Sequence, residues 1–228
     1  MASRTAGQAR TLGDIAPVTP AQRSALAGLK RVGVLDWVYL ARGAAVAEHL
    51  RHRTSNALDL FSRADDLDLE AVRRRVAALP GTTVIAQTDA ALKLSVGGAM
   101  VDFVRYPYRP LGRFKPGPEG VRVAGLRDLA VMKLAAIARR GARRDYWDLH
   151  VILGHRRVTL RAACDDYVAK FGVSAADLYH VLRAVGWFED AESEATFPRG
   201  LTKRGWAAIR EHLQQEAAQE LLRRTSGA

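Results

Sequence analysis

Residues 39–61 of this 228-residue chain read YLARGAAVAEHLRHRTSNALDLF. A short apolar strand ends at Ala41, Gly43 breaks it, and Ala44 to Arg51 has a helical pattern. A second strand, 57–61, then carries the carboxylate of Asp59. A glycine turn that opens a helix presents backbone N–H groups to phosphate, and a strand carboxylate is a ligand for Mg²⁺. The stretch therefore predicts a strand–turn–helix–strand unit that binds phosphate beside a divalent cation.

The flanking sequence predicts the other elements. Thr19 and Gln22 have the spacing of a capping box, and Asp66 is the expected cap of a later helix. Gly97-Gly98 between two apolar segments predicts a hairpin. Further strands are expected at 82–88, 91–96, 99–106 and 121–124, and helices at 20–31, 67–79, 125–140, 145–153, 158–171, 174–185 and 201–223. A mixed α/β first half is thus followed by a helical second half.

These patterns divide the chain into three parts. Residues 1–18 are rich in small residues and arginine and are expected to form a mobile tail. Residues 19–115 are expected to form an α/β core, and residues 116–228 a helical C-terminal part. The boundary is placed in the proline- and glycine-rich loop near 107–120.

Composition narrows the class of partner. Lys and Arg number 35 against 24 Asp and Glu, a net charge of +11, which favours nucleic acid, a nucleotide or an anionic surface as partner. The sequence has neither an apolar run of about 18 residues nor an apolar signal segment, so a cytoplasmic protein that does not enter membranes is expected. The single cysteine, Cys164, excludes a disulfide framework and is expected to be a small apolar helix residue.

A second carboxylate, Asp102, lies on the expected strand 99–106. Carboxylates on adjacent strands can converge on Mg²⁺. Two such ions would activate a hydroxyl nucleophile and neutralise a leaving pyrophosphate.

The order of these motifs resembles the AbiEii/AbiGii toxin family of polymerase-β-like nucleotidyltransferases, the toxin half of a type IV toxin–antitoxin pair. Two later segments, LAVMKL at 129–134 and RDYWDL at 144–149, continue the resemblance, which covers residues 37–153. It implies an α/β (α+β) fold: a nucleotidyltransferase-like small mixed sheet with flanking helices, followed by a helical C-terminal part.

The resemblance also implies the site residues. It assigns catalysis to Asp59, Asp102, Lys133 and Asp145. The first two would hold Mg²⁺ or Mn²⁺, and the nucleotide would be bound by Gly43, Arg42, Ser55 and Lys133. Asp145 and Asp148 are helix neighbours. Asp145 either acts near the nucleotide or simply begins a helix and pairs with an arginine.

The sequence departs from the family pattern at two positions. Arg42 stands where the first glycine is expected, and Ala57 stands where the first carboxylate of an Asp-x-Asp pair is expected. Residues 57 and 59 share a strand face, so one metal ligand is missing. Arg42 either obstructs the phosphate path, contacts a phosphate, or is a solvated surface arginine.

Several cations are candidates for anion binding. Lys133 falls on an apolar helix face, where a lysine requires an acidic partner or an anionic ligand. The densest basic cluster is expected either to contact nucleic acid or to be a solvated face; it consists of Arg139, Arg140, Arg143 and Arg144.

The resemblance implies nucleotide transfer from an NTP, with Mg²⁺, to an acceptor hydroxyl, with the 3′ end of tRNA as the expected acceptor and an antitoxin as a partner. Ala57 and Arg42 keep a second hypothesis open: a catalytically impaired relative that binds nucleotide, RNA or a partner protein without turnover. A third is DNA binding by the helical half through 201–223.

Overall fold

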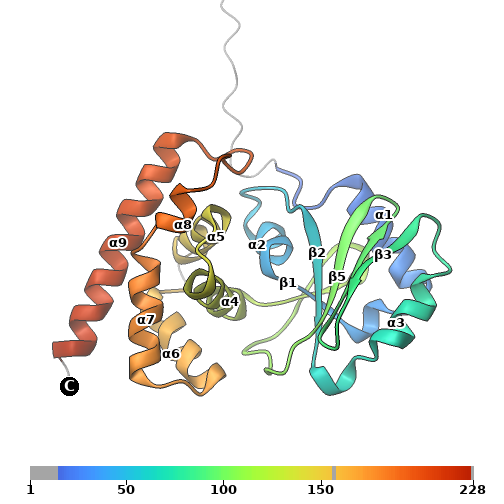
Figure 1. Ribbon diagram of the computed structural model, residues 1–228, viewed down its shortest axis with the longest axis horizontal. Coiled ribbons are helices and arrows are strands. Elements are labelled where there is room, and N and C mark those ends of the chain that lie inside the picture. Colours follow the sequence, from blue (N-terminus) through green and yellow to red (C-terminus); the bar gives the residue numbers. More distant parts are fainter. Residues whose placement is uncertain (1–14, 156–157, 227–228) are drawn as a thin grey trace, which may run out of the picture.

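The computed structural model describes residues 15–155 and 158–226. Figure 1 shows two halves side by side: a sheet with its helices, and a helical half that follows it in the chain. Most of the expected tail, residues 1–14, lies outside the described residues. At the end of the expected tail, which was placed at residues 1–18, Pro17 and Val18 are buried, and the carbonyl of Pro17 accepts a hydrogen bond from the backbone N–H of Ser55.

In the described part of the chain, seven strands form one mixed sheet in the order β3-β4-β5-β2-β1-β7-β6. Strands β1–β2, β3–β4, β4–β5 and β6–β7 pair antiparallel, whereas β1–β7 and β2–β5 pair parallel. The strands are β1 (Tyr39–Ala41), β2 (Ala57–Ser62), β3 (Thr82–Gln87), β4 (Ala91–Val96), β5 (Ala99–Arg105), β6 (Lys115–Pro116) and β7 (Arg122–Val123). The expected hairpin is confirmed: Gly97 and Gly98 join β4 to β5 with φ of 55° and 82°, a conformation that glycine adopts without strain.

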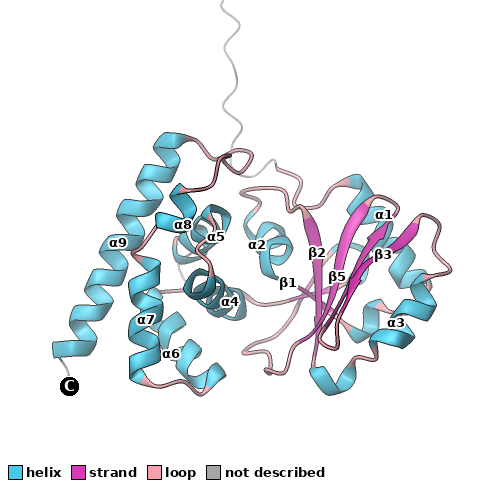
Figure 2. Cartoon of the chain, in the orientation of Figure 1, coloured by secondary structure: helices cyan, strands magenta, loops and turns pink. Residues whose placement is uncertain are grey.

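Along β2 and β5, buried apolar side chains alternate with carboxylates, so the two kinds of side chain project from opposite faces of the sheet. Leu58 and Leu60 of β2, and Val101 and Phe103 of β5, are fully buried. Asp59 and Asp102 lie between them in the sequence and therefore project from the opposite face. In Figure 2 helices α1 (Pro20–Arg31) and α3 (Leu69–Val76) cover one side of the sheet. Helix α2 (Arg42–Leu50) and the helical half lie on the other side.

The caps of two helices test the sequence rules. The capping box of α1 is confirmed, because Gln22 N–H donates to Thr19 Oγ1 and Thr19 N–H donates to Gln22 Oε1, at 3.1 and 2.8 Å. The expected cap of α3 is wrong: Asp68, not Asp66, accepts from the backbone N–H groups of Glu70 and Ala71. Asp66 belongs to a short 3₁₀ turn before the helix.

The helical half contains every long helix that the sequence predicted, with small shifts at the ends. These helices are α4 (Leu126–Arg139), α5 (Arg143–Leu153), α6 (Leu160–Phe171), α7 (Ala175–Val185) and α9 (Lys203–Ser226). The short α8 (Glu189–Glu192) was not expected. Helix α9 packs against α5 and α7 through a buried stripe that includes Trp206, Ile209 and Leu213. Buried Cys164 on α6 fits the apolar role expected of it.

The proposed division at 115/116 falls inside β6, and β7 beyond it also belongs to the sheet. One continuous cluster of buried apolar residues runs through both halves. The sheet therefore ends later than the predicted core, and the domain division stays a prediction. No helix among the described residues is long and apolar enough to span a membrane.

Candidate active site

The two strand carboxylates lie side by side. Asp59 on β2 and Asp102 on β5 are paired in register in the parallel ladder, so their side chains project from the same face of the sheet. Both residues are partly buried, and Asp102 Oδ1 is a buried atom without a hydrogen-bond partner among the described residues. Two adjacent carboxylates with one unsatisfied oxygen suit a hard divalent cation.

Electrostatics at Asp59 favour the same conclusion. Burial raises the pKa of Asp59, Arg42 lowers it in part, and the neighbouring carboxylate of Asp102 raises it further. A carboxylate whose charge is disfavoured in this way gains from a nearby cation. Ala57, on the same strand face, supplies no side-chain oxygen, and no group of three or more His, Cys, Asp or Glu among the described residues is arranged to hold a metal ion. The pair thus fits one divalent ion whose other ligands are water or substrate.

Arg42 lies directly against Asp59. Ala41 is opposite Asp59 in the β1–β2 ladder, so the next residue begins α2 beside that carboxylate. Arg42 Nη1 is 3.3 Å from Asp59 Oδ1, and the guanidinium carbon is 5.0 Å from the centre of the Phe61 ring. Its backbone has φ of 49°, in the left-handed region where glycine is favoured. The contacts place Arg42 beside Asp59 while its side chain stays 53% exposed, and the three interpretations of Arg42 stay predictions.

Lys133 is buried in α4, at 4% exposure, with two acidic partners. Its Nζ lies 2.7 Å from Asp145 Oδ1 and 2.6 Å from Asp148 Oδ2, both on α5. The expected pairing of Asp145 with an arginine is wrong: Asp145 lies in the first turn of α5 and pairs with Lys133. A bond to two carboxylates stabilises the ammonium group in the protein interior.

Asp148 is the centre of a buried ionic cluster. Arg53 donates to both of its oxygens, from Nε and Nη2, at 2.7 Å each, and His52 Nε2 lies 2.8 Å from Oδ1. Burial alone would raise the pKa of Asp148, but Lys133, Arg53 and His52 outweigh it and hold the pKa far below its usual range. Burial lowers the pKa of His52, so this ring is neutral and its Nε2–H donates to Asp148. Arg53 and Lys133 therefore balance Asp145 and Asp148.

Gly43 makes room for this cluster. A Cβ at residue 43 would lie 2.5 Å from Nη2 of Arg53, which the two bonds to Asp148 hold in place. The need for glycine here is thus explained by packing. No side chain caps the first turn of α2, in which Gly43, Ala44 and Ala45 are buried. The phosphate-binding role of Gly43 stays a prediction.

Ser55 is engaged within the protein. Its hydroxyl donates to the carbonyl of Ala57, its N–H donates to Pro17, and its carbonyl accepts from Gln22 Nε2. These bonds fix the turn that leads into β2. A hydrogen bond donated by Ser55 to a nucleotide would require its hydroxyl or its N–H to change partner.

The four arginines of the basic cluster at 139–144 differ in exposure: one is buried and three are exposed. Arg143 is 2% exposed, donates to the carbonyls of Glu194 and Thr196, and stacks on Phe197 at 4.0 Å. Arg143 is therefore not available to nucleic acid, in contrast to the sequence prediction. The other three, Arg139, Arg140 and Arg144, are exposed.

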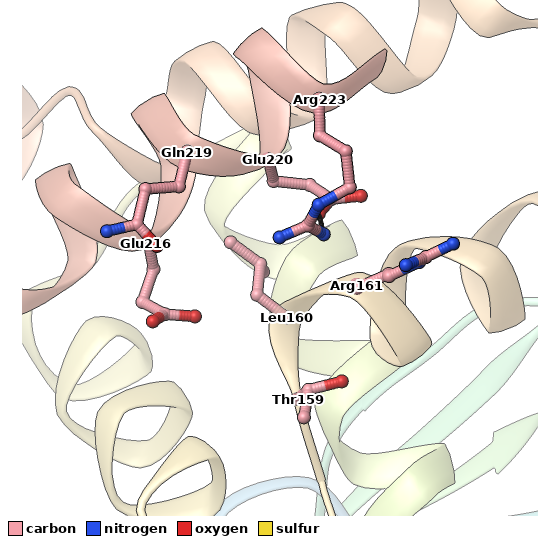
Figure 3. Close-up of a pocket in the computed structure, with 7 residues that line it drawn as sticks. All are labelled: Thr159, Leu160, Arg161, Glu216, Gln219, Glu220 and Arg223. Atoms are coloured by element: carbon pink, nitrogen blue, oxygen red, sulfur yellow. Dashed lines mark hydrogen bonds and ion pairs between the residues drawn. The ribbon is translucent and has the colours of Figure 1, made fainter. Parts of the chain in front are cut away.

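Two pockets show where a ligand has room. One of about 280 Å³ opens beside the carboxylates and is lined by Arg42, Asp102 and the facing parts of β3 and β4. The other, of about 220 Å³, lies between the start of α6 and the last turns of α9 (Figure 3). In that pocket the carboxylate of Glu220 is already paired with Arg223 and Arg224. Only the first pocket adjoins the candidate active site.

Sequence reasoning missed the roles of His52, Arg53 and Asp148. The HR dipeptide before β2 and the second acid of the Asp145–Asp148 pair were the available signals. The partners of these residues are nearly a hundred positions away in the chain, with Arg53 and Asp148 separated by 95 residues.

Comparison with known proteins supports the fold and the family. A sequence model described as "Nucleotidyl transferase AbiEii toxin, Type IV TA system" matches residues 74–224, a span that includes Asp102, Lys133 and Asp145 but begins after Asp59. An uncharacterized protein of Aquifex aeolicus (strain VF5), aq_aa25, is 27% identical over 175 residues, covering 76% of this chain and 84% of that protein.

Two solved structures share the fold. The nucleotidyltransferase toxin MenT4 of Mycobacterium tuberculosis H37Rv superposes with a TM-score of 0.51 at 15% identity, covering 87% of this chain and 85% of that one. The antibiotic-resistance factor ANT(2'')-Ia has a TM-score of 0.51 at 12% identity, covering 65% of this chain and 90% of that one. The expected nucleotidyltransferase-like α/β fold is confirmed.

Proposed function

Because the chain belongs to the AbiEii nucleotidyl transferase toxin family of type IV toxin–antitoxin systems, we propose that it transfers a nucleotide from an NTP to an acceptor hydroxyl, with a divalent ion held by Asp59 and Asp102. The observation that carries this proposal is the in-register pairing of the two carboxylates, with Asp102 Oδ1 left without a partner among the described residues. Mg²⁺ or Mn²⁺ bound there would neutralise charge on the triphosphate.

The reaction needs one bond to form and one to break. The acceptor oxygen bonds to the α-phosphorus of the NTP, the bond from that phosphorus to the α–β bridging oxygen breaks, and pyrophosphate leaves. In this proposal the hydroxyl proton passes to the carboxylate of Asp102 and from there to water.

The cations around the carboxylates would orient the triphosphate. Arg42 is exposed beside Asp59, and the field of Lys133 reaches the same carboxylate. In this proposal Lys133 and Gly43 bind phosphate as nucleotide approaches the start of α2, while Asp145 holds the lysine ammonium in position.

For the acceptor we favour RNA, with the tRNA 3′ end as the specific proposal. The support is electrostatic: a net charge of +11 and the exposed arginines of the α4–α5 junction. A cognate antitoxin and a cytoplasmic location are proposed on the family alone.

The test is incubation of the purified protein with each labelled NTP, Mg²⁺ or Mn²⁺, and total tRNA. We expect labelled RNA from the unaltered protein, and at least about a hundredfold less from Asp59→Asn. Asp65→Asn is the matched control, because Asp65 is an exposed acid in the turn after β2. Equal labelling by Asp59→Asn would contradict the proposal.

A second candidate function has its own support. Ala57 supplies no carboxylate for a metal ion, and Asp59 is already paired with Arg42. Both features favour a protein that binds nucleotide, RNA or a partner protein without turnover. In that case the unaltered protein would bind tRNA or NTP but transfer no label. Ala57→Asp combined with Arg42→Gly would then create transfer activity.

A further inference from the structure

Two positions around Asp59 depart from the pattern that the chain resembles, and the structure brings both to the same carboxylate. Ala57 lies two residues before Asp59 on the same face of β2. Arg42 reaches Asp59 from the start of α2, with Nη1 3.3 Å from Oδ1. Around Asp59, one potential metal ligand is therefore missing, at Ala57, and one fixed positive charge is present, at Arg42.

The charges of these two positions compensate for one metal ion. An alanine in place of an aspartate removes one negative charge, and an arginine in place of a glycine adds one positive charge. Their sum is the charge of one divalent cation. The net charge at the site with one ion and Arg42 therefore equals that of a site with two ions, a third carboxylate and no arginine. Two divalent ions on Asp59 and Asp102 beside Arg42 would leave a large uncompensated positive charge.

The backbone at Arg42 is consistent with a functional role. Its φ of 49° lies in the left-handed region, which is disfavoured for a residue with a Cβ. Non-glycine residues in this region cluster at functional sites, although the same conformation at Arg51 is simply the left-handed C-cap of α2. Arg51 thus provides a matched comparison at the other end of the same helix.

The guanidinium group of Arg42 also has unused donors. Its side chain is 53% exposed, and its one hydrogen bond among the described residues is to Asp59. Guanidinium carries five N–H donors, so a phosphate can bind its free edge while the Asp59 contact is kept. Arg42 lines the pocket of about 280 Å³ together with Asp102, so its side chain borders space that a ligand can enter.

We propose that Arg42 takes the place of the second divalent ion: the site binds one ion at Asp59 and Asp102, and the Arg42 guanidinium binds substrate phosphate as a fixed cation. The phosphate part rests on the proposed nucleotidyl transfer, whereas the number of ions does not.

The first test counts Mn²⁺ bound by the full chain without nucleotide, from the electron paramagnetic resonance signal of free Mn²⁺. We expect one ion per chain for the unaltered protein and none for Asp102→Asn. Arg42→Gly should bind its ion about two- to fivefold more tightly, because a competing partner of Asp59 is removed. Arg51→Gly removes the same charge and the same backbone strain and should change nothing. The double variant Ala57→Asp, Arg42→Gly should bind two ions.

The second test measures the affinity for inorganic triphosphate by calorimetry without metal. Arg42→Gly should weaken it roughly tenfold, and Arg51→Gly should not. Two Mn²⁺ per unaltered chain, no Mn²⁺ at all, or equal effects of the two glycine variants would overturn the proposal. One bound Mn²⁺ without any nucleotide transfer would contradict the proposed function and leave the assignment of the ion intact.

Discussion

Arg53 and Asp148 are joined by two hydrogen bonds of 2.7 Å although 95 residues separate them in the chain. Arg53 precedes β2, and Asp148 lies in the middle of α5. Their pair therefore links the turn before β2 to the helical half. Lys133 and Asp145 complete the cluster, in which two positive and two negative charges cancel. Because each charge is paired, the four groups are stable in the protein interior.

Removing one charge from this cluster should be strongly destabilising. Asp148→Asn leaves Arg53 and Lys133 with one carboxylate instead of two, and an unpaired buried charge costs about 3–5 kcal/mol in the free energy of unfolding. Urea unfolding followed by circular dichroism measures this loss. A matched control is Asp166→Asn, since Arg127 and Asp166 form a similar two-bond pair with a 60% exposed arginine. That change should cost about 0.2–1 kcal/mol. Equal losses would show that burial of the Asp148 cluster is energetically unimportant.

Asp59→Asn should have the opposite effect at neutral pH. Burial raises the pKa of Asp59, so the folded state prefers the protonated acid and ionisation above that pKa reduces stability. Asparagine removes this cost, so the variant should melt at a higher temperature than the unaltered protein near pH 7. The gain should disappear as the pH falls toward about 4, where an ordinary carboxyl is protonated. Thermal melts without divalent ions, with Asp65→Asn as control, measure it. A lower melting temperature for Asp59→Asn at neutral pH would contradict the assigned pKa direction.

The success of sequence reasoning depended on how local each feature is. The capping box of Thr19 and Gln22, the Gly97-Gly98 hairpin and the strands that carry Asp59 and Asp102 depend on neighbours in the chain, and each is present in the structure. The cap of α3 was missed because Asp65, Asp66 and Asp68 all have suitable chemistry. The observed start is fixed by Leu67 and Leu69, which are both buried.

Residues whose roles depend on distant partners could not be predicted in the same way. The run that contains Arg143 indicated either contact with nucleic acid or a solvated face, but residues 194–197 cover that side chain. Lys133 was recognised as unusual on an apolar helix face. Its two carboxylate partners became evident only when α4 and α5 were packed together.

Gly43→Ala should disturb the site through Arg53. The added methyl carbon would lie 2.5 Å from Arg53 Nη2, and the two bonds to Asp148 prevent the guanidinium from moving away freely. Overpacking of this kind costs about 1–3 kcal/mol. Gly112→Ala is the control, because a Cβ there meets no atom within 4 Å. Chemical denaturation of both variants should show a loss for the first and none for the second; an unaffected Gly43→Ala would mean that Arg53 relaxes without losing Asp148.

The contact between α5 and α9 should weaken in mild acid. Nδ1 of His150 lies 2.9 Å from Nδ1 of His212, so the two nitrogens share at most one proton. Burial lowers the pKa of His150, and His212 lowers it further. A histidine with a lowered pKa stabilises the fold above its ordinary value of about 6.5, and that stability is lost as the pH falls below it. His150→Gln should therefore reduce the fall in melting temperature between about pH 7 and pH 5. His180→Gln, at an exposed position on α7, should follow the unaltered protein. If all three proteins lose the same stability over this range, the histidine pair does not contribute to the pH dependence.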